Sequence, residues 1–141
     1  MNKICGVELK GSEAIIVLLE KQDAGYVHLD IEPRKIKLGD DESSDHIQSF
    51  FETFQNFARQ HDVELTVIKK RAQKGQMAGG AISFKMEALI QLNGISDVRF
   101  ETGQGIAASE KKAPFKLPGN LKKYQEDAFK SAALYIRKLG V

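Results

Sequence analysis

The chain has 141 residues, of which 42% are hydrophobic and 28% are charged, and its formal net charge is +2. This composition is typical of one compact soluble domain, and the net charge alone is too small to indicate a nucleic-acid partner. Cys5 is the only cysteine, which excludes a disulfide framework and a thiolate metal site. No stretch is long and apolar enough to span a membrane or to act as a targeting segment. We therefore expect a single domain over residues 1–141, located in the cytoplasm.

Three strand-like segments come first. Residues 3–9 and 14–19 are short apolar runs separated by a turn at Gly11. Residues 26–37 alternate polar and apolar side chains, and Pro33 predicts that this third strand lies at an edge or bends there. Because the turns are short, the three strands are predicted to form an antiparallel meander.

Helices and strands then alternate. A helix is predicted to begin at Ser43 or Ser44, because Ile47, Phe50, Phe51, Phe54 and Ala58 recur at helical spacing. The chain then gives a strand over 64–68, a helix from 79–80 to 93–94, and a strand over 98–100. The last helix is expected over 121–139.

Residues 102–119 are predicted to be a long loop, because they contain two prolines, three glycines and several lysines. The spaced glycines Gly103 and Gly105 follow a strand but are not expected to open a helix, which makes a phosphate-binding loop a weak interpretation.

Two clusters of basic residues stand out. One comprises Lys69, Lys70, Arg71 and Lys74, and the other comprises Lys111, Lys112, Lys116, Lys122 and Lys123. Each suits an anionic ligand. The first cluster is equally consistent with a solvated loop, and the second is more often just a solvated loop. The helix expected at Gly79-Gly80 has free backbone N–H groups that favour phosphate. Phe115 and Tyr124 lie within or beside the second cluster and could stack a nucleic-acid base.

Glu8 is the residue that most needs an explanation, because it places a carboxylate inside an apolar strand. Burying an unpaired charge costs several kcal/mol or shifts its pKa. A second carboxylate, Asp127, lies at the edge of the apolar stripe of the last helix, whereas Glu126 points away from that stripe.

The order β-β-β-α-β-α-β-α resembles the ribonuclease H-like superfamily, and within it the RuvC-type resolvase branch. The residues that carry the resemblance are Gly6-Val7-Glu8, Ile68-Lys69-Lys70 and the segment 126–133. The chain also looks like a small uncharacterised bacterial family placed in this superfamily. The resemblance implies a mixed five-stranded sheet of order 3-2-1-4-5, with the first strand central, and three helices.

The resemblance also implies a catalytic and metal site. Active members hold two Mg²⁺ or Mn²⁺ ions with three or four carboxylates, and Glu8 and Asp127 match two of these positions. The acid of the fourth strand is replaced by Lys69-Lys70-Arg71, which cannot bind a cation. A lysine or arginine beside Glu8 and Asp127 could instead replace the charge of the metal.

Two functions follow from these residues. The first is a catalytically reduced module that binds nucleic acid or another partner, with Lys69, Lys70, Arg71, Lys74, Lys112 and Lys116 contacting the anion. The alternative is a nuclease that uses Mg²⁺ or Mn²⁺ on Glu8 and Asp127, with a third ligand from Glu101 or from substrate phosphate. The sequence identifies neither a protein partner nor an oligomeric state.

Overall fold

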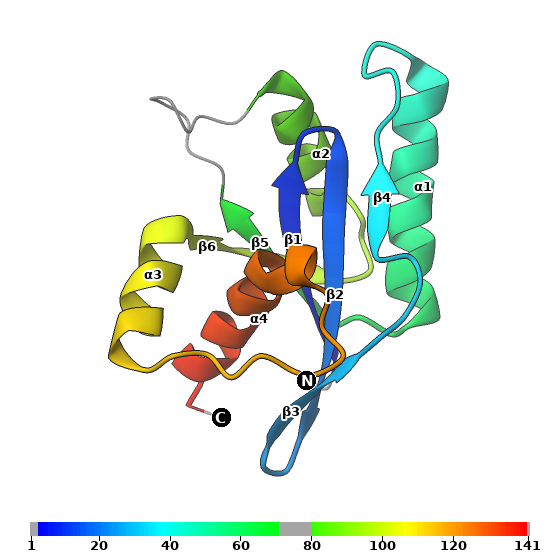
Figure 1. Ribbon diagram of the computed structural model, residues 1–141. Helices are drawn as coiled ribbons and strands as arrows, with labels where there is room; N and C mark the ends of the chain where they lie inside the picture. Colours follow the sequence, from blue (N-terminus) through cyan, green and yellow to red (C-terminus); the bar gives the residue numbers. More distant parts are fainter. Residues whose placement is uncertain (1–2, 71–79, 141) are drawn as a thin grey trace.

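The computed structural model describes residues 3–70 and 80–140 (Figure 1). Its strands are β1 (Lys3–Lys10), β2 (Glu13–Gln22), β3 (Gly25–Leu29), β4 (Lys35–Lys37), β5 (Leu65–Lys70) and β6 (Asp97–Thr102). Its helices are α1 (Ser44–Gln60), α2 (Ala81–Gln91), α3 (Gly103–Lys112) and α4 (Glu126–Lys138), with a 3₁₀ turn, η1 (Lys123–Gln125), directly before α4. None of the described helices is both long and apolar enough to cross a bilayer.

The strands form one mixed sheet of order β3-β2-β1-β5-β6, in which β4 also pairs with β2. β1 is antiparallel to β2 and parallel to β5, and β5 is parallel to β6. The order expected from the sequence is therefore confirmed, with the first strand in the centre. The sheet differs from that expectation by one additional strand.

The extra strand arises because the predicted third strand is interrupted. The segment 26–37 contains β3 and β4, which both pair antiparallel with β2 and are separated by residues around Pro33. Proline has no N–H to donate to a sheet ladder, so the pairing stops and resumes a few residues later.

A fourth helix lies where a loop was predicted. The prediction for residues 102–119 was wrong at its N-terminal half, because Gly103–Lys112 form α3. The Thr102 side chain caps this helix by accepting a hydrogen bond of 2.9 Å from the Gly105 N–H. Ile106 is the only α3 residue buried, so the segment lacks the apolar repeat that normally reveals a helix.

Two apolar cores lie on the two faces of the sheet. One face packs against α1 and α2, and β1 contributes Cys5, Val7 and Leu9 to it. The other face packs against α4, whose N-terminal end lies in front of β1 in Figure 1. Because side chains alternate along a strand, Ile4, Gly6 and Glu8 point toward α4.

Gly6 allows α4 to approach β1 closely. A Cβ atom at this position would lie 2.0 Å from the Ala128 carbonyl oxygen and 3.1 Å from the Ala132 Cβ. Only glycine therefore fits without moving the helix away from the sheet. This contact places the first turn of α4 directly over the strand that carries Glu8.

We expect Gly6→Ala to destabilise the fold by about 3 kcal/mol, because the added methyl group overlaps helix backbone that cannot move independently. Urea unfolding measured by circular dichroism checks this. Gly119→Ala is the matched control, because a Cβ there meets no atom within 4 Å. Equal stabilities for the two variants would contradict the close-packing role of Gly6.

Candidate functional site

Glu8 and Asp127 come together between β1 and α4, as the sequence predicted. Glu8 is buried, with 9% of its surface exposed, and Asp127 lies in the first turn of α4. The two carboxyl groups are close enough that each acts on the pKa of the other. Two ionised carboxylates so close together repel each other, which favours a proton on one of them.

Lys69 completes this cluster. It follows Ile68, which pairs with Val7, so that β5 carries Lys69 beside Glu8 on the face covered by α4. The Lys69 Nζ lies 3.0 Å from the Asp127 Oδ2. The hypothesis that a basic residue pairs with these carboxylates is therefore confirmed for Lys69 and Asp127.

The environment moves the two carboxyl pKa values apart. Burial, and then the negative charge of Asp127, raise the pKa of Glu8, and the charge of Lys69 only partly opposes them. Burial also acts to raise the pKa of Asp127, but the hydrogen bond and charge of Lys69 and the hydrogen bond from Glu8 outweigh it, and that pKa is lowered. Glu8 is consequently the carboxyl group of the pair that takes up a proton first as the pH falls.

The residues present do not fit a two-metal centre. Within the described ranges, no group of three or more His, Cys, Asp or Glu side chains is placed to hold a metal ion. Glu101, the candidate third ligand, instead accepts a hydrogen bond of 2.7 Å from the Lys138 Nζ. The Lys69 ammonium group is already paired with the Asp127 carboxylate.

A cavity of about 380 Å³ opens beside the cluster, between α3 and α4. Its lining contains more positive than negative side chains, namely Lys69, Lys111 and Lys130 against Glu110 and Asp127. Both acids are already paired, because Lys130 contacts Glu110 and Lys69 contacts Asp127. The cavity therefore favours an anionic ligand over a cation.

Sequence reasoning missed α3, although Thr102 at its start was a usable capping signal.

Of the other predicted anion-binding residues, the three that the structure describes do not line this cavity. Lys70 lies on the opposite face of the sheet from Lys69, where its charge acts on Glu87 of α2. Lys112 lines a separate cavity of about 310 Å³ with Arg137 and Lys138. Lys116 is exposed on the segment between α3 and η1. Arg71, Lys74 and Gly79 lie outside the described residues.

Glu8→Gln tests the raised pKa of Glu8. A buried carboxyl with a raised pKa contributes stability at low pH and loses it as the pH rises through its folded pKa. We therefore expect wild type to lose stability relative to Glu8→Gln between about pH 4 and about pH 7. Urea unfolding at both pH values measures this, with Glu13→Gln as an exposed-carboxylate control. A stability difference independent of pH would contradict the assignment.

The sequence of this chain matches a protein family whose function is not known. Residues 1–135 match the model of a family described as "Protein of unknown function (DUF3010)". A sequence comparison with curated proteins finds no match.

Solved structures of resolvases have a similar fold. The RuvC structure from Thermus thermophilus superposes with a TM-score of 0.72 at 9% sequence identity, covering 98% of this chain and 96% of that chain. RuvC from T. thermophilus in complex with Holliday junction substrate gives 0.67 at 10% identity, with coverages of 98% and 96%. The Holliday junction resolvase of fowlpox virus gives 0.56 at 10% identity, with coverages of 97% and 99%. The chain thus belongs to the family of unknown function DUF3010, and its fold is the ribonuclease H-like fold of RuvC-type resolvases.

Proposed function

We propose that this protein is a catalytically reduced, ribonuclease H-like module that binds nucleic acid. The observation that carries the proposal is the 3.0 Å contact between Lys69 and Asp127. In this arrangement a fixed ammonium group occupies the neighbourhood where an active member of the superfamily would need further carboxylates and divalent cations. The fold is retained while the requirement for metal is removed.

The charge of the site supports binding of an anion without metal. Lys69 and Lys111 line the cavity between α3 and α4, and the charge of Lys10 also reaches Glu8. Ammonium groups bind phosphate as point charges and need no metal to do so. One protein with the same fold, RuvC of T. thermophilus, has been solved with Holliday junction substrate. Branched or single-stranded DNA is therefore the first class of ligand to test.

Removing lysines beside the cluster tests the proposal. We expect the double variant Lys10→Ala/Lys111→Ala to bind DNA more weakly and to lower the salt slope of log K by about 1 for each phosphate that is no longer bound. Fluorescence anisotropy with labelled four-way, duplex and single-stranded DNA measures both quantities. The control is Lys21→Ala, which should bind like wild type. Lys21 lies near the C-terminal end of β2, whereas Lys10 pairs with Glu13 at the start of that strand. Unchanged affinity and salt slope in the double variant would refute this binding surface.

The charge-replacement hypothesis has its own test in Lys69→Glu, which adds a third carboxylate beside Glu8 and Asp127. We expect millimolar Mn²⁺ to raise the Tm of this variant by at least about 3 °C, because binding of metal to the folded state stabilises it. Lys69→Gln removes the same charge without adding a ligand and is the matched control. An equal response to Mn²⁺ in wild type, Lys69→Gln and Lys69→Glu would show that Lys69 does not exclude the metal.

The alternative function is a divalent-metal-dependent nuclease, which the contact between Glu8 and Asp127 favours. A cleavage gel with Mg²⁺ and Mn²⁺ compares wild type with Asp127→Asn on single-stranded, duplex, hybrid and branched substrates. We expect no metal-dependent cleavage by either protein. Cleavage by wild type that Asp127→Asn abolishes would establish the nuclease instead.

Cytoplasmic location remains a prediction from the sequence.

A further inference from the structure

Tyr124 is the most exposed Tyr or Phe side chain among the described residues, at 38%. It lies in η1, one turn before Asp127. Phe115 and Tyr26 are less available for stacking. Phe115 is buried, and the Arg137 guanidinium lies 3.9 Å from its ring centroid. Tyr26 packs against Phe129.

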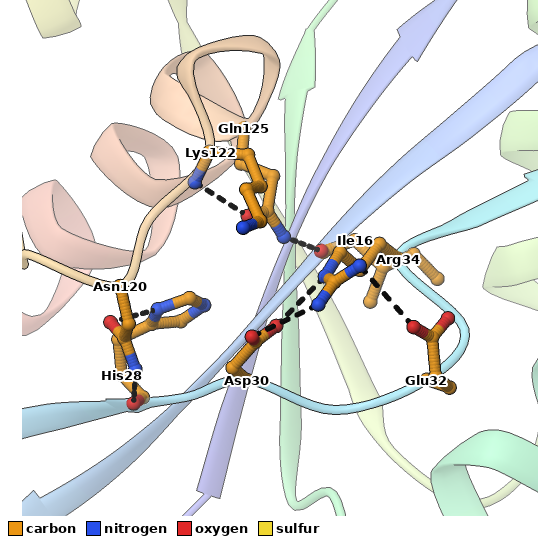
Figure 2. A network of polar contacts seen from close by, with 8 residues as sticks. All are labelled: Ile16, His28, Asp30, Glu32, Arg34, Asn120, Lys122 and Gln125. Carbon is orange, nitrogen blue, oxygen red and sulfur yellow. Dashed lines mark hydrogen bonds and ion pairs between the residues drawn. The ribbon is translucent and has the colours of Figure 1, made fainter.

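The backbone that carries Tyr124 is fixed on the sheet. Figure 2 shows the neighbouring Gln125 side chain directed at β2, where its Nε2 donates a hydrogen bond of 3.0 Å to the Ile16 carbonyl oxygen. The Gln125 Oε1 also accepts a hydrogen bond from the Lys122 N–H. Upstream, Asn120 forms two hydrogen bonds with His28, one to its ring and one to its carbonyl oxygen. Tyr124 is therefore held in place before any ligand arrives.

The sheet register places Tyr124 near the carboxylate–lysine cluster. Glu8 pairs with Ile15, and Ile15 pairs with Lys35, so these three residues form one row across the sheet on the face toward α4. The backbones of neighbouring strands are about 4.8 Å apart, which puts the Lys35 backbone roughly 10 Å from the Glu8 backbone. The Lys35 Nζ lies 4.3 Å from the centroid of the Tyr124 ring. The ring and the Glu8–Asp127–Lys69 cluster thus lie on the same face, about two strand spacings apart.

Lys35 covers one face of this ring without being tightly held. Its side chain is 42% exposed, and its ion pair with Glu13 has a length of 4.0 Å. An exposed pair of this length contributes little to stability. A planar ligand can therefore take the place of the ammonium group at small cost. The displaced ammonium group would remain close enough to contact an adjacent phosphate.

We propose that Tyr124 stacks on an unpaired base of a nucleic acid whose backbone is held by the lysines beside Asp127. This inference rests on the proposed function and narrows it to nucleic acid with an unpaired nucleotide. The stacked base occupies the ring face now covered by Lys35, and Lys35 contacts the phosphate next to that base. Stacking on an aromatic ring tolerates any base, so recognition depends on the base being unpaired and not on its identity.

The experiment compares an oligo-dT strand with an abasic strand of the same length, which has the same phosphates but no bases. We expect Tyr124→Ala to weaken binding of oligo-dT roughly fivefold or more, the loss typical of one stacked base. Its affinity for the abasic strand and for duplex DNA should stay at the wild-type value, as should the salt slope. Tyr124→Phe should retain wild-type binding, because the ring is kept.

Two controls separate stacking from folding. Leu117→Ala removes another exposed apolar side chain, 41% exposed, from the preceding segment and should bind like wild type. The chain contains no tryptophan, so Tyr124→Trp introduces a single fluorescent reporter. Its emission should be quenched by oligo-dT and not by the abasic strand. Thermal unfolding by circular dichroism verifies that each variant is folded.

The outcomes distinguish this inference from the proposed function. Equal losses on oligo-dT and the abasic strand, or no loss on either, would overturn stacking by Tyr124 while leaving the binding function in place. Absence of any salt-dependent binding by wild type to all of the strands would overturn the proposed function, and the stacking role with it.

Discussion

The close approach of α4 to β1 at Gly6 is the constraint on which the rest of this structure depends. Because Gly6 has no side chain, the carbonyl oxygen of Ala128 can occupy the space that a Cβ atom would fill. The apolar residues of α4 then close the second core against β1, β2 and β5. The same approach brings Asp127 onto Glu8, so that one packing contact both stabilises the fold and creates the polar cluster.

Once the carboxylates are this close, their charges must be compensated. Bringing two ionised carboxylates together in a partly buried site is unfavourable, which raises the pKa of Glu8, and the ammonium group of Lys69 beside Asp127 offsets part of the negative charge. A two-metal centre would provide the same compensation, but it would need more carboxylate ligands than this cluster has. Lys69 on β5 thus compensates part of the negative charge of the cluster without a metal ion.

α3 and the segment between α3 and α4 form the surface around the Glu8–Asp127–Lys69 cluster. The segment between α3 and α4 is tied to β2 and β3 by Asn120 and Gln125, so it presents Tyr124 in a fixed position. α3 closes one side of the lysine-lined cavity. The exposed aromatic ring and the cavity lie on either side of the Glu8–Asp127–Lys69 cluster. Together they form the surface that we propose for nucleic acid, with positive charge on one side and an exposed aromatic ring on the other.

Much of this protein follows from local sequence pattern. The order of the main strands, the amphipathic helix α1, and Glu8 and Asp127 as site carboxylates are readable from periodicity and from a resemblance in element order. α3 was missed because it buries only Ile106. β4 was predicted as the second half of one strand with a bend at Pro33, and the structure divides that strand there into β3 and β4. Only the tertiary structure decided which lysine meets the carboxylates. Alternation along β5 sends Lys69 toward α4 and Lys70 toward α2, and the parallel register with β1 then sets Lys69 beside Glu8. Contacts between residues 58 positions apart depend on packing that no local pattern encodes.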